Sequence, residues 1–131
     1  MTNVRYIVAV GLTHNILEML KFAVMKHLPA EYTELVFVSY RNLDEAVAEA
    51  HEGQNNILLL GYNNPDASLD QVRNVISQHK ISKTLILDSS KKAQKDTRLD
   101  GLLGPSSYRI LLIPFARLRV FILNFKWALG Q

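Results

Sequence analysis

Three short stretches of this sequence hold the side chains that could do chemistry, and each follows a run of apolar residues. Residues 61–66 (GYNNPD) contain Asp66, residues 88–90 (DSS) contain Asp88 and Ser89, and residues 11–15 (GLTHN) contain His14. A carboxylate can act as a nucleophile or help to bind Mg²⁺, and a histidine can accept a phosphoryl group when a neighbour fixes its tautomer. Each of these reactions requires that the stretches meet in space.

The apolar run before residues 61–66 indicates how the three stretches would come together in the fold. Residues 57–60 (ILLL) show no alternation of apolar and polar side chains, which is typical of a strand covered on both faces. Gly61 ends the run. In an open parallel sheet, ligands bind outside the carboxyl ends of the strands. We therefore expect any site of this protein at residues 61–66 and the neighbouring strand ends.

Strands and helices alternate along the chain. Five strands joined by helices and short loops imply parallel pairing, right-handed crossovers and helices on both faces of the sheet. The length suits one domain with its own core, so residues 1–131 are interpreted as a single α/β domain. The predicted strands are residues 6–10, 35–40, 57–60, 84–87 and 108–113.

Capping residues predict where the helices begin and end. Pro29 should end the first helix and Gly53 the second. The glycines and proline of residues 99–107 predict a short fourth helix, and residues 116–129 should form the last. The expected N-caps are Thr13 or Asn15 for the first helix, Asn42 with Glu45 for the second, and Ser68 with Gln71 for the third.

Composition narrows the classes of function. The chain has no cysteine, which excludes zinc–thiolate sites, thiol catalysis and disulfides and favours a cytoplasmic setting. No apolar run is long enough to span a membrane. The net charge of +3 is too small to indicate nucleic-acid binding, and the basic residues within 80–98 are interpreted as a solvated helix face.

The order of elements, together with the loop GYNNPDAS after the third strand, resembles the receiver domain of bacterial response regulators. The resemblance implies a flavodoxin-like three-layer fold with strand order 2-1-3-4-5. In receivers a phosphoacceptor aspartate ends the third strand and a proline commonly follows four residues later; Gly61 and Pro65 stand there in this sequence. A hydroxyl residue ends the fourth strand, matched by Ser89, and a lysine–proline pair often followed by phenylalanine ends the fifth, matched by Ile113, Pro114 and Phe115.

The departures from that pattern fall on the groups that carry out phosphoryl transfer. Aspartyl phosphorylation needs a carboxylate nucleophile, an acidic cluster that binds Mg²⁺, and a cation that offsets the charge on the phosphoryl oxygens. Gly61 replaces the nucleophile, Val10 and Gly11 stand where the acidic pair is expected, and Ile113 replaces the lysine. Asp66 and Asp88 match no carboxylate of the family, so we expect no metal, no cofactor and no enzymatic activity.

The resemblance therefore implies a degenerate receiver, or pseudo-receiver. Such domains act in signalling as protein-binding and dimerising modules whose conformation is not set by phosphate. The partner would be a second copy, another signalling protein, or an output domain that follows Gln131; we expect no nucleic acid and no membrane. Receivers often have a cis bond at the equivalent of Ile113–Pro114, and we expect one here.

His14 supports an alternative. Its loop, GLTHN, resembles the phosphohistidine loop of mannose-family phosphocarrier domains, which would make His14 a phosphoryl acceptor. Asn15 replaces the second glycine of that pattern, and no carboxylate is evident that would orient the ring. The other histidines, His27, His51 and His79, fall near helix ends and indicate no function.

The last helix carries two apolar stripes. At 100° per residue, one stripe is wide enough to face the sheet. A second stripe on the opposite side holds Val120, Leu123 and Trp127 between basic residues and an asparagine. An apolar stripe that points away from the core and carries the only tryptophan is typical of an association surface. We expect a two-fold homodimer through this stripe, with help from Tyr108.

Overall fold

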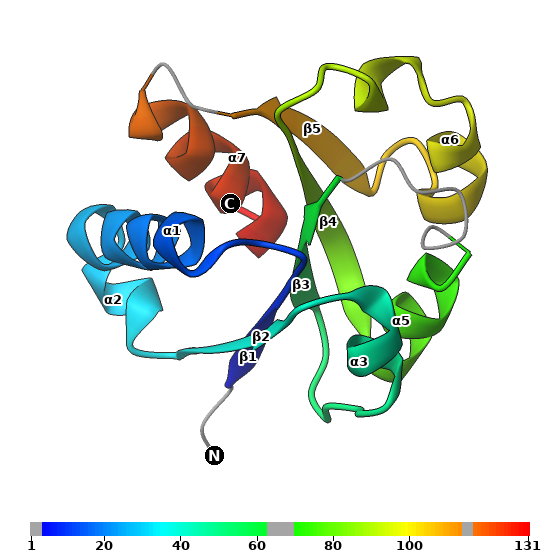
Figure 1. Cartoon of the computed structure of the whole chain (residues 1–131). Coiled ribbons are helices and arrows are strands. Elements are labelled where there is room, and N and C mark those ends of the chain that lie inside the picture. The colour runs from blue at the N-terminus through cyan, green and yellow to red at the C-terminus, as the bar shows by residue number, and fades with distance from the viewer. Residues whose placement is uncertain (1–3, 63–69, 114–116) are drawn as a thin grey trace.

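A computed structural model describes residues 4–62, 70–113 and 117–131 of the chain. The expectations that concern Pro65, Asp66, Ser68, Phe115 and the Ile113–Pro114 bond fall outside these residues. Within them, the chain forms one sheet with helices on both of its faces (Figure 1).

The sheet has five parallel strands in the order β2-β1-β3-β4-β5, which confirms the expected flavodoxin-like topology. The buried parts of the three central strands are apolar on both faces: residues 7–10 of β1, 57–60 of β3 and 85–87 of β4. The strands are β1 (Arg5–Val10), β2 (Leu35–Tyr40), β3 (Asn56–Gly61), β4 (Ile81–Asp88) and β5 (Tyr108–Leu112).

Helices divide the core into two layers, one on each face of the sheet. α1 (His14–His27), α2 (Pro29–Tyr32) and α7 (Leu118–Leu129) cover one face, where Phe121 and Phe125 are fully buried. α3 (Leu43–Val47), α5 (Val72–Gln78) and α6 (Arg98–Leu103) cover the other, with the short 3₁₀ helix η1 (Ala93–Lys95) beside α6 (Figure 1). Side chains of β1, β3 and β4 alternate between the two layers, so each strand contributes to both.

Two of the predicted helix starts are confirmed. The hydroxyl of Thr13 accepts a hydrogen bond from the Ile16 amide at the start of α1. At the start of α3, the Asn42 side chain accepts from the Glu45 amide at 2.9 Å, and the Glu45 carboxylate accepts from the Arg41 amide. These side chains satisfy amide groups that a helix leaves without a partner in its first turn.

Other predicted boundaries differ. Pro29 ends α1 but also occupies the first turn of α2, where its missing N–H costs nothing. The second helix ends at Val47 rather than at Gly53. Residues 48–55 leave the helical path because His51 turns inward and stacks on Tyr6 of β1. Gly53 supplies a positive φ of 102° in this connection instead of ending a helix.

In the part of the chain that the structure describes, no helix is both long and apolar enough to cross a membrane.

Candidate functional site

The carboxyl edge of the sheet brings together the positions that sequence comparison with receivers singled out. Val10 at the end of β1 pairs with Leu60, and Gly61 at the end of β3 pairs with Leu87 of β4. At the end of β4, the carbonyl of Asp88 accepts a hydrogen bond from the Ile113 amide at 3.0 Å. The strand ends are thus adjacent, as a site at this edge requires.

Gly61 lies against the backbone of the loop that follows β1. A Cβ atom at Gly61 would overlap the carbonyl oxygen of Gly11 and would lie 3.0 Å from its carbonyl carbon and 3.3 Å from Leu12 Cδ2. Gly11 has φ 74°, a conformation that favours glycine, and its amide donates to the Tyr40 carbonyl at 3.0 Å. The two glycines therefore bring the two backbones together and leave no room for a side chain on Gly61.

Apolar groups surround this contact. Val10 is buried, and Leu12 and Ile113 pack against the core layer under α1 and α7. None of these residues can coordinate a cation or stabilise a phosphoryl oxygen. Among the described residues, no group of three histidine, aspartate or glutamate side chains is placed to hold a metal ion.

Asp88 is a carboxylate at the end of β4, and both of its oxygens accept hydrogen bonds within the protein. One oxygen accepts from the Ser90 amide at 2.8 Å and from the Ser90 hydroxyl at 2.6 Å, and the other accepts from the Ala93 amide at 2.8 Å. Burial raises the pKa of Asp88, but the hydrogen bonds from Ser90, Ala93 and Lys92 outweigh that effect and lower it. Asp88 thus organises the turn after β4.

This placement corrects the role expected of Ser89. β4 continues to Asp88, so the residue at the end of the strand is the aspartate, and Ser89 lies beyond it with an exposed side chain. The strand extends because the Asp88 carbonyl joins the ladder to β5 while its side chain accepts from the following turn. Ser89 therefore follows the strand instead of ending it.

A second carboxylate, on Asp96, fixes the exit of β3. The buried Tyr62 donates its hydroxyl to Asp96 at 2.9 Å, and Arg98 pairs with the same carboxylate at 2.8 Å. Hydrogen bonds from Arg98 hold the pKa of Asp96 well below its usual range, while burial and the bond to Asp96 raise the pKa of Tyr62. No local sequence pattern indicates the contact between Tyr62 and Asp96, because the two residues are 34 positions apart.

His14 is the first residue of α1 and is exposed. It lines a hollow of about 380 Å³ with Tyr40, Arg41 and Glu45 among its neighbours. The Glu45 carboxylate is occupied by Arg41, at 3.2 Å from its Nε. No side chain of the described residues is hydrogen-bonded to the His14 imidazole in a way that would fix its tautomer, as a phosphohistidine requires.

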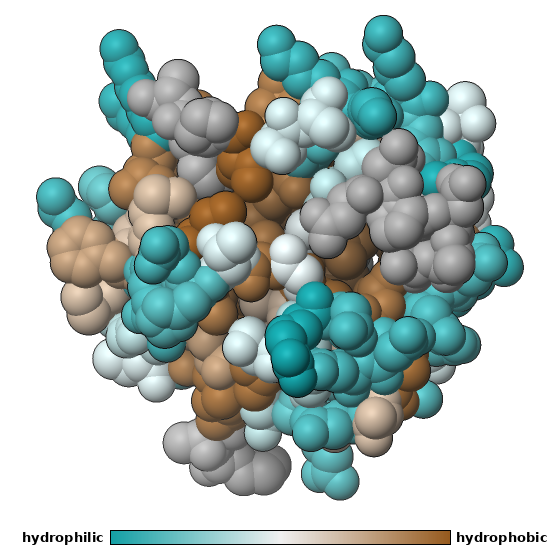
Figure 2. All heavy atoms as spheres, in the orientation of Figure 1, coloured by the Kyte–Doolittle hydropathy of each residue, from teal (hydrophilic) through white to brown (hydrophobic). Residues whose placement is uncertain are grey.

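The proposed association stripe on α7 is only partly free. Val120 is 43 % exposed and Leu123 58 % exposed, whereas Trp127 is half-buried against the core. The ring of Trp127 is covered by two cations, with Lys83 Nζ at 4.9 Å and Arg109 Cζ at 4.2 Å from its centroid. In Figure 2, hydrophobic residues reach the surface in the region of α1 and α7, and hydrophilic ones cover the region of α3.

Tyr108 does not belong to that stripe. It packs with the core layer on the opposite face of the sheet, and its hydroxyl donates to Asp100 of α6 at 2.6 Å. That hydrogen bond, with burial, raises the pKa of Tyr108 to about 12. The period of two along β5 explains the difference, since Arg109 and Leu111 face α7 while Tyr108 and Ile110 face α6.

His51 and His79, for which the sequence indicates no function, belong to an aromatic cluster beside α3. His51 stacks on Tyr6 with ring centroids 4.5 Å apart and lies 5.0 Å from His79. His79 is fully buried and its Nε2 donates to the Ala46 carbonyl at 2.7 Å, while its Nδ1 has no hydrogen-bond partner among the described residues. Tyr40 closes the cluster, 5.7 Å from the ring of His79.

The hydroxyl of Tyr40 links this cluster to Glu49. It donates to the Glu49 carboxylate at 2.6 Å and lies 3.0 Å from His51 Nε2, which leaves His51 to donate through Nε2. Burial lowers the pKa of His51, and His79 lowers it further, against a smaller opposite effect of Glu49. The cluster therefore holds the connection between α3 and β3 in place with His51 neutral.

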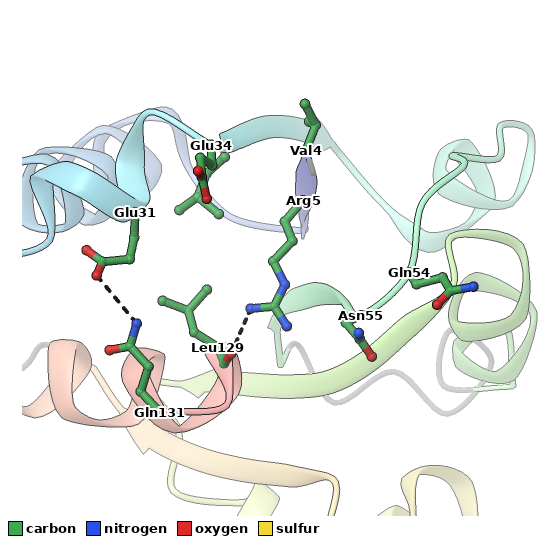
Figure 3. Close-up of a pocket in the computed structure, with 9 residues that line it drawn as sticks. Val4, Arg5, Glu31, Glu34, Gln54, Asn55, Leu129 and Gln131 are labelled. Carbon is green, nitrogen blue, oxygen red and sulfur yellow. Dashed lines mark hydrogen bonds between the residues drawn. The ribbon is translucent and has the colours of Figure 1, made fainter. Parts of the chain in front are cut away.

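A further cavity lies at the amino edge of the sheet, away from the strand ends described above. It has a volume of about 550 Å³ and is lined by polar residues that include Glu31, Glu34 and Gln54 (Figure 3). Arg5 extends across it and donates to the Leu129 carbonyl at 2.9 Å. Burial lowers the pKa of Arg5, whose guanidinium satisfies a carbonyl in the last turn of α7.

Comparison with solved structures identifies the fold as that of a receiver domain. A structure titled "BeF3 Activated DrrB Receiver Domain" superposes with a TM-score of 0.66 at 12 % sequence identity, covering 98 % of this chain and 99 % of the other. A structure titled "Crystal structure of a response regulator from Thermotoga maritima" superposes with a TM-score of 0.65 at 15 % identity and the same coverage. No protein-family model matches the sequence, and no curated protein is significantly similar to it.

Proposed function

We propose that this chain is a pseudo-receiver: a receiver-like domain that binds other proteins in signal transduction without being phosphorylated. The observation that carries the proposal is the contact between Gly61 and Gly11. At the end of β3, where a receiver has its phosphoacceptor, this chain has a glycine whose Cβ position is filled by backbone. A carboxylate nucleophile therefore has neither the atoms nor the space to exist there.

The surroundings support the same proposal. Phosphoryl transfer to a carboxylate needs Mg²⁺ and a cation beside the transferred group. Val10 and Ile113 are aliphatic, so neither can bind Mg²⁺ or act as the cation. The carboxylate oxygens of Asp88 already accept hydrogen bonds from Ser90 and Ala93. Among the described residues of this edge, no carboxylate is left free to react with a phosphodonor.

The exposed surface of α7 supports the second part of the proposal, that the chain binds other proteins. Val120 and Leu123 project from α7 as exposed aliphatic side chains, on a helix whose other side already fills the core. Exposed apolar side chains of this kind mark association surfaces when charged residues surround them. A two-fold homodimer, expected from the sequence, is one possible occupant of this surface.

The phosphorylation test uses acetyl phosphate, or beryllofluoride, with Mg²⁺. We expect no mass increase and no change in the fluorescence of Trp127, the single tryptophan. An active receiver run in parallel shows that the reagents work. Stoichiometric phosphate on this chain would overturn the proposal. A label stable in base, lost in acid and absent from His14→Ala would establish the phosphocarrier alternative instead.

A further inference from the structure

Charge is divided unevenly between the two halves of the chain. Residues 1–79 contain 5 lysines and arginines and 9 aspartates and glutamates, a net charge of −4, whereas residues 80–131 contain 10 and 3, a net charge of +7. No acidic residue follows Asp100. Arg109 of β5, Arg117 at the N-cap of α7, and Arg119 and Lys126 of α7 are four of these basic residues. Neither β5 nor α7 carries an acidic residue, so this edge of the sheet and the helix that covers it are basic.

The exposed aliphatic pair on α7 lies at the centre of this basic region. Val120 and Leu123 are one helical turn apart, and helical spacing places Arg117 next to Val120, and Arg119 and Lys126 next to Leu123. Arg109 of β5 adjoins the same side, since its guanidinium donates to Asn124 at 3.2 Å. We call this surface the basic face; it consists of Val120, Leu123, Arg109, Arg117, Arg119 and Lys126.

Contacts of Arg109 fix one side of the basic face. Arg109 reaches both Asn124 and the ring of Trp127, and Asn124 in turn donates to the Val120 carbonyl at 2.8 Å. Lys83 covers the same ring from β4. A side chain that is already fixed, such as Arg109, loses little conformational entropy when a partner binds, which favours binding.

We propose that the basic face binds an acidic amphipathic helix of a partner protein, with the apolar side of that helix on Val120 and Leu123 and its carboxylates against the surrounding cations. This inference rests on the proposed function and names the class of partner. Leucine-type anchors match the aliphatic centre, and glutamates match a rim that has no acidic residue of its own.

Charge disfavours the two-fold homodimer expected from the sequence. A two-fold axis through α7 would place Arg117, Arg119 and Lys126 of one copy against the same residues of the other. The chain offers no carboxylate on α7 or β5 that could compensate. Like charges that face each other across an interface oppose association, particularly at low salt.

The same face is poorly suited to nucleic acid. Proteins that bind single strands stack bases on aromatic side chains that line a basic groove. Trp127 is the aromatic residue next to these cations, and its ring is already covered by Lys83 and Arg109. The centre of the face is aliphatic, which suits the side chains of a helix better than phosphates.

The test uses a designed probe. A fluorescein-labelled helical peptide of about four turns carries leucines at helical i, i+3, i+4 and i+7 spacing and glutamates elsewhere. We expect saturable binding by anisotropy, a change in Trp127 emission, and affinity at least about tenfold weaker when salt rises from about 50 to 500 mM. A peptide of the same composition with its leucines spread around the helix should bind at least about tenfold more weakly.

Matched variants locate the binding surface. Leu123→Ser and Arg119→Glu on the basic face should each weaken peptide binding about tenfold. Phe22→Ser removes a side chain of similar exposure on α1 (55 % against 58 % for Leu123), and Lys26→Glu makes the same charge change there; neither should matter. Circular dichroism and urea unfolding establish that each variant is folded.

Several results would overturn the inference: equal binding of the two peptides, loss of binding in Phe22→Ser rather than in Leu123→Ser, or no binding at about 100 μM. Tighter binding to single-stranded DNA or to phosphatidylserine vesicles than to the peptide would replace it with an anionic polymer or lipid. A dimer by sedimentation that Leu123→Ser abolishes would replace it with a second copy. None of these results depends on phosphorylation, so the failure of either proposal can be recognised separately.

Discussion

The backbone of Gly11 occupies the space that a side chain on Gly61 would need. Gly11 has a positive φ of 74°, and its carbonyl oxygen overlaps the position that a Cβ of Gly61, at the end of β3, would take. The first loop of the domain is therefore packed against the third strand through main-chain atoms. This contact closes the edge of the sheet at which receivers are phosphorylated.

Substitution of Gly61 should destabilise the protein. Gly61→Ala should lower the free energy of unfolding by about 1–3 kcal/mol, because the added methyl group overlaps backbone that cannot rotate out of the way. Urea unfolding followed by circular dichroism measures the change. Gly61→Asp should be no more stable than Gly61→Ala, and it should still fail to bind beryllofluoride.

Gly101 provides the matched control. A Cβ atom there meets no atom within 4 Å, and the residue lies inside α6. Gly101→Ala should raise the free energy of unfolding by about 0.5–1 kcal/mol through helix propensity. If Gly61→Ala were as stable as the native chain, the loop after β1 would not be packed against the end of β3 as described. The main support for the pseudo-receiver proposal would then fail.

Asp88 should contribute to stability through its hydrogen bonds rather than through chemistry. Asp88→Ala leaves the amides of Ser90 and Ala93 without acceptors and should cost about 2–4 kcal/mol. Asp70→Ala removes an exposed carboxylate and should change stability by less than about 0.5 kcal/mol. A small effect of Asp88→Ala would contradict the assigned hydrogen bonds.

The contribution of Asp88 should also depend on pH. The pKa of Asp88 is lower in the folded chain than its ordinary value of 3.8, so the unfolded chain binds the proton more tightly. The stabilisation is complete above pH 3.8 and is lost as the pH falls through the folded value. The difference in unfolding free energy between the native chain and Asp88→Ala should therefore shrink below that pH.

His51 should make the fold less stable in mild acid. Its folded pKa lies below the ordinary 6.5, so protonation favours the unfolded chain, and its contribution is complete above pH 6.5 and declines as the pH falls below it. The groups that face its ring are Tyr6, Tyr40, Glu49 and His79. Urea unfolding between about pH 5 and pH 8 measures the decline.

The comparison that isolates His51 uses two glutamine variants. His51→Gln removes the titrating group and should flatten the pH dependence. His27→Gln, at the exposed end of α1, should leave it unchanged. If the native chain and His51→Gln show the same slope from about pH 7 to pH 5, then the environment assigned to His51 is wrong.

Trp127 should contribute to the stability of the fold although part of its side chain is exposed. Trp127→Ala removes core contacts and the ring that Lys83 and Arg109 cover, and should cost about 2–4 kcal/mol. Leu123→Ala, one turn earlier and 58 % exposed, should cost less than about 0.5 kcal/mol. Equal stability of the two variants would place Trp127 outside the core.

The strands were the part of the fold that sequence reasoning predicted best. Runs such as residues 57–60 are apolar on both faces because helices cover both, and this pattern survives any detail of the loops. The sequence predicts a helix that continues up to Gly53, because glycine is typical of a helix end. The stacking of His51 on Tyr6 decided otherwise, and a contact between residues 45 positions apart has no local pattern.

Some features of the candidate site can likewise be predicted from the sequence, and others cannot. Missing groups, such as a carboxylate at Gly61 or a lysine at Ile113, are visible in residue types. The closure of Gly61 on Gly11 and the capture of Asp88 by the next turn depend on distances, which residue types do not encode. Trp127 fell on the outward stripe of a helical wheel, yet the long side chains of Lys83 and Arg109 reach over its ring.

The hydrogen bond from Arg5 to Leu129 spans 124 positions of the sequence. It joins the first strand, which lies inside the sheet, to the last turn of the last helix. This bond therefore brings the beginning and the end of the described chain close together. A backbone rejoined there by a short linker and cut at an exposed loop should keep the same sheet, with β1 entering it from the middle of the new chain.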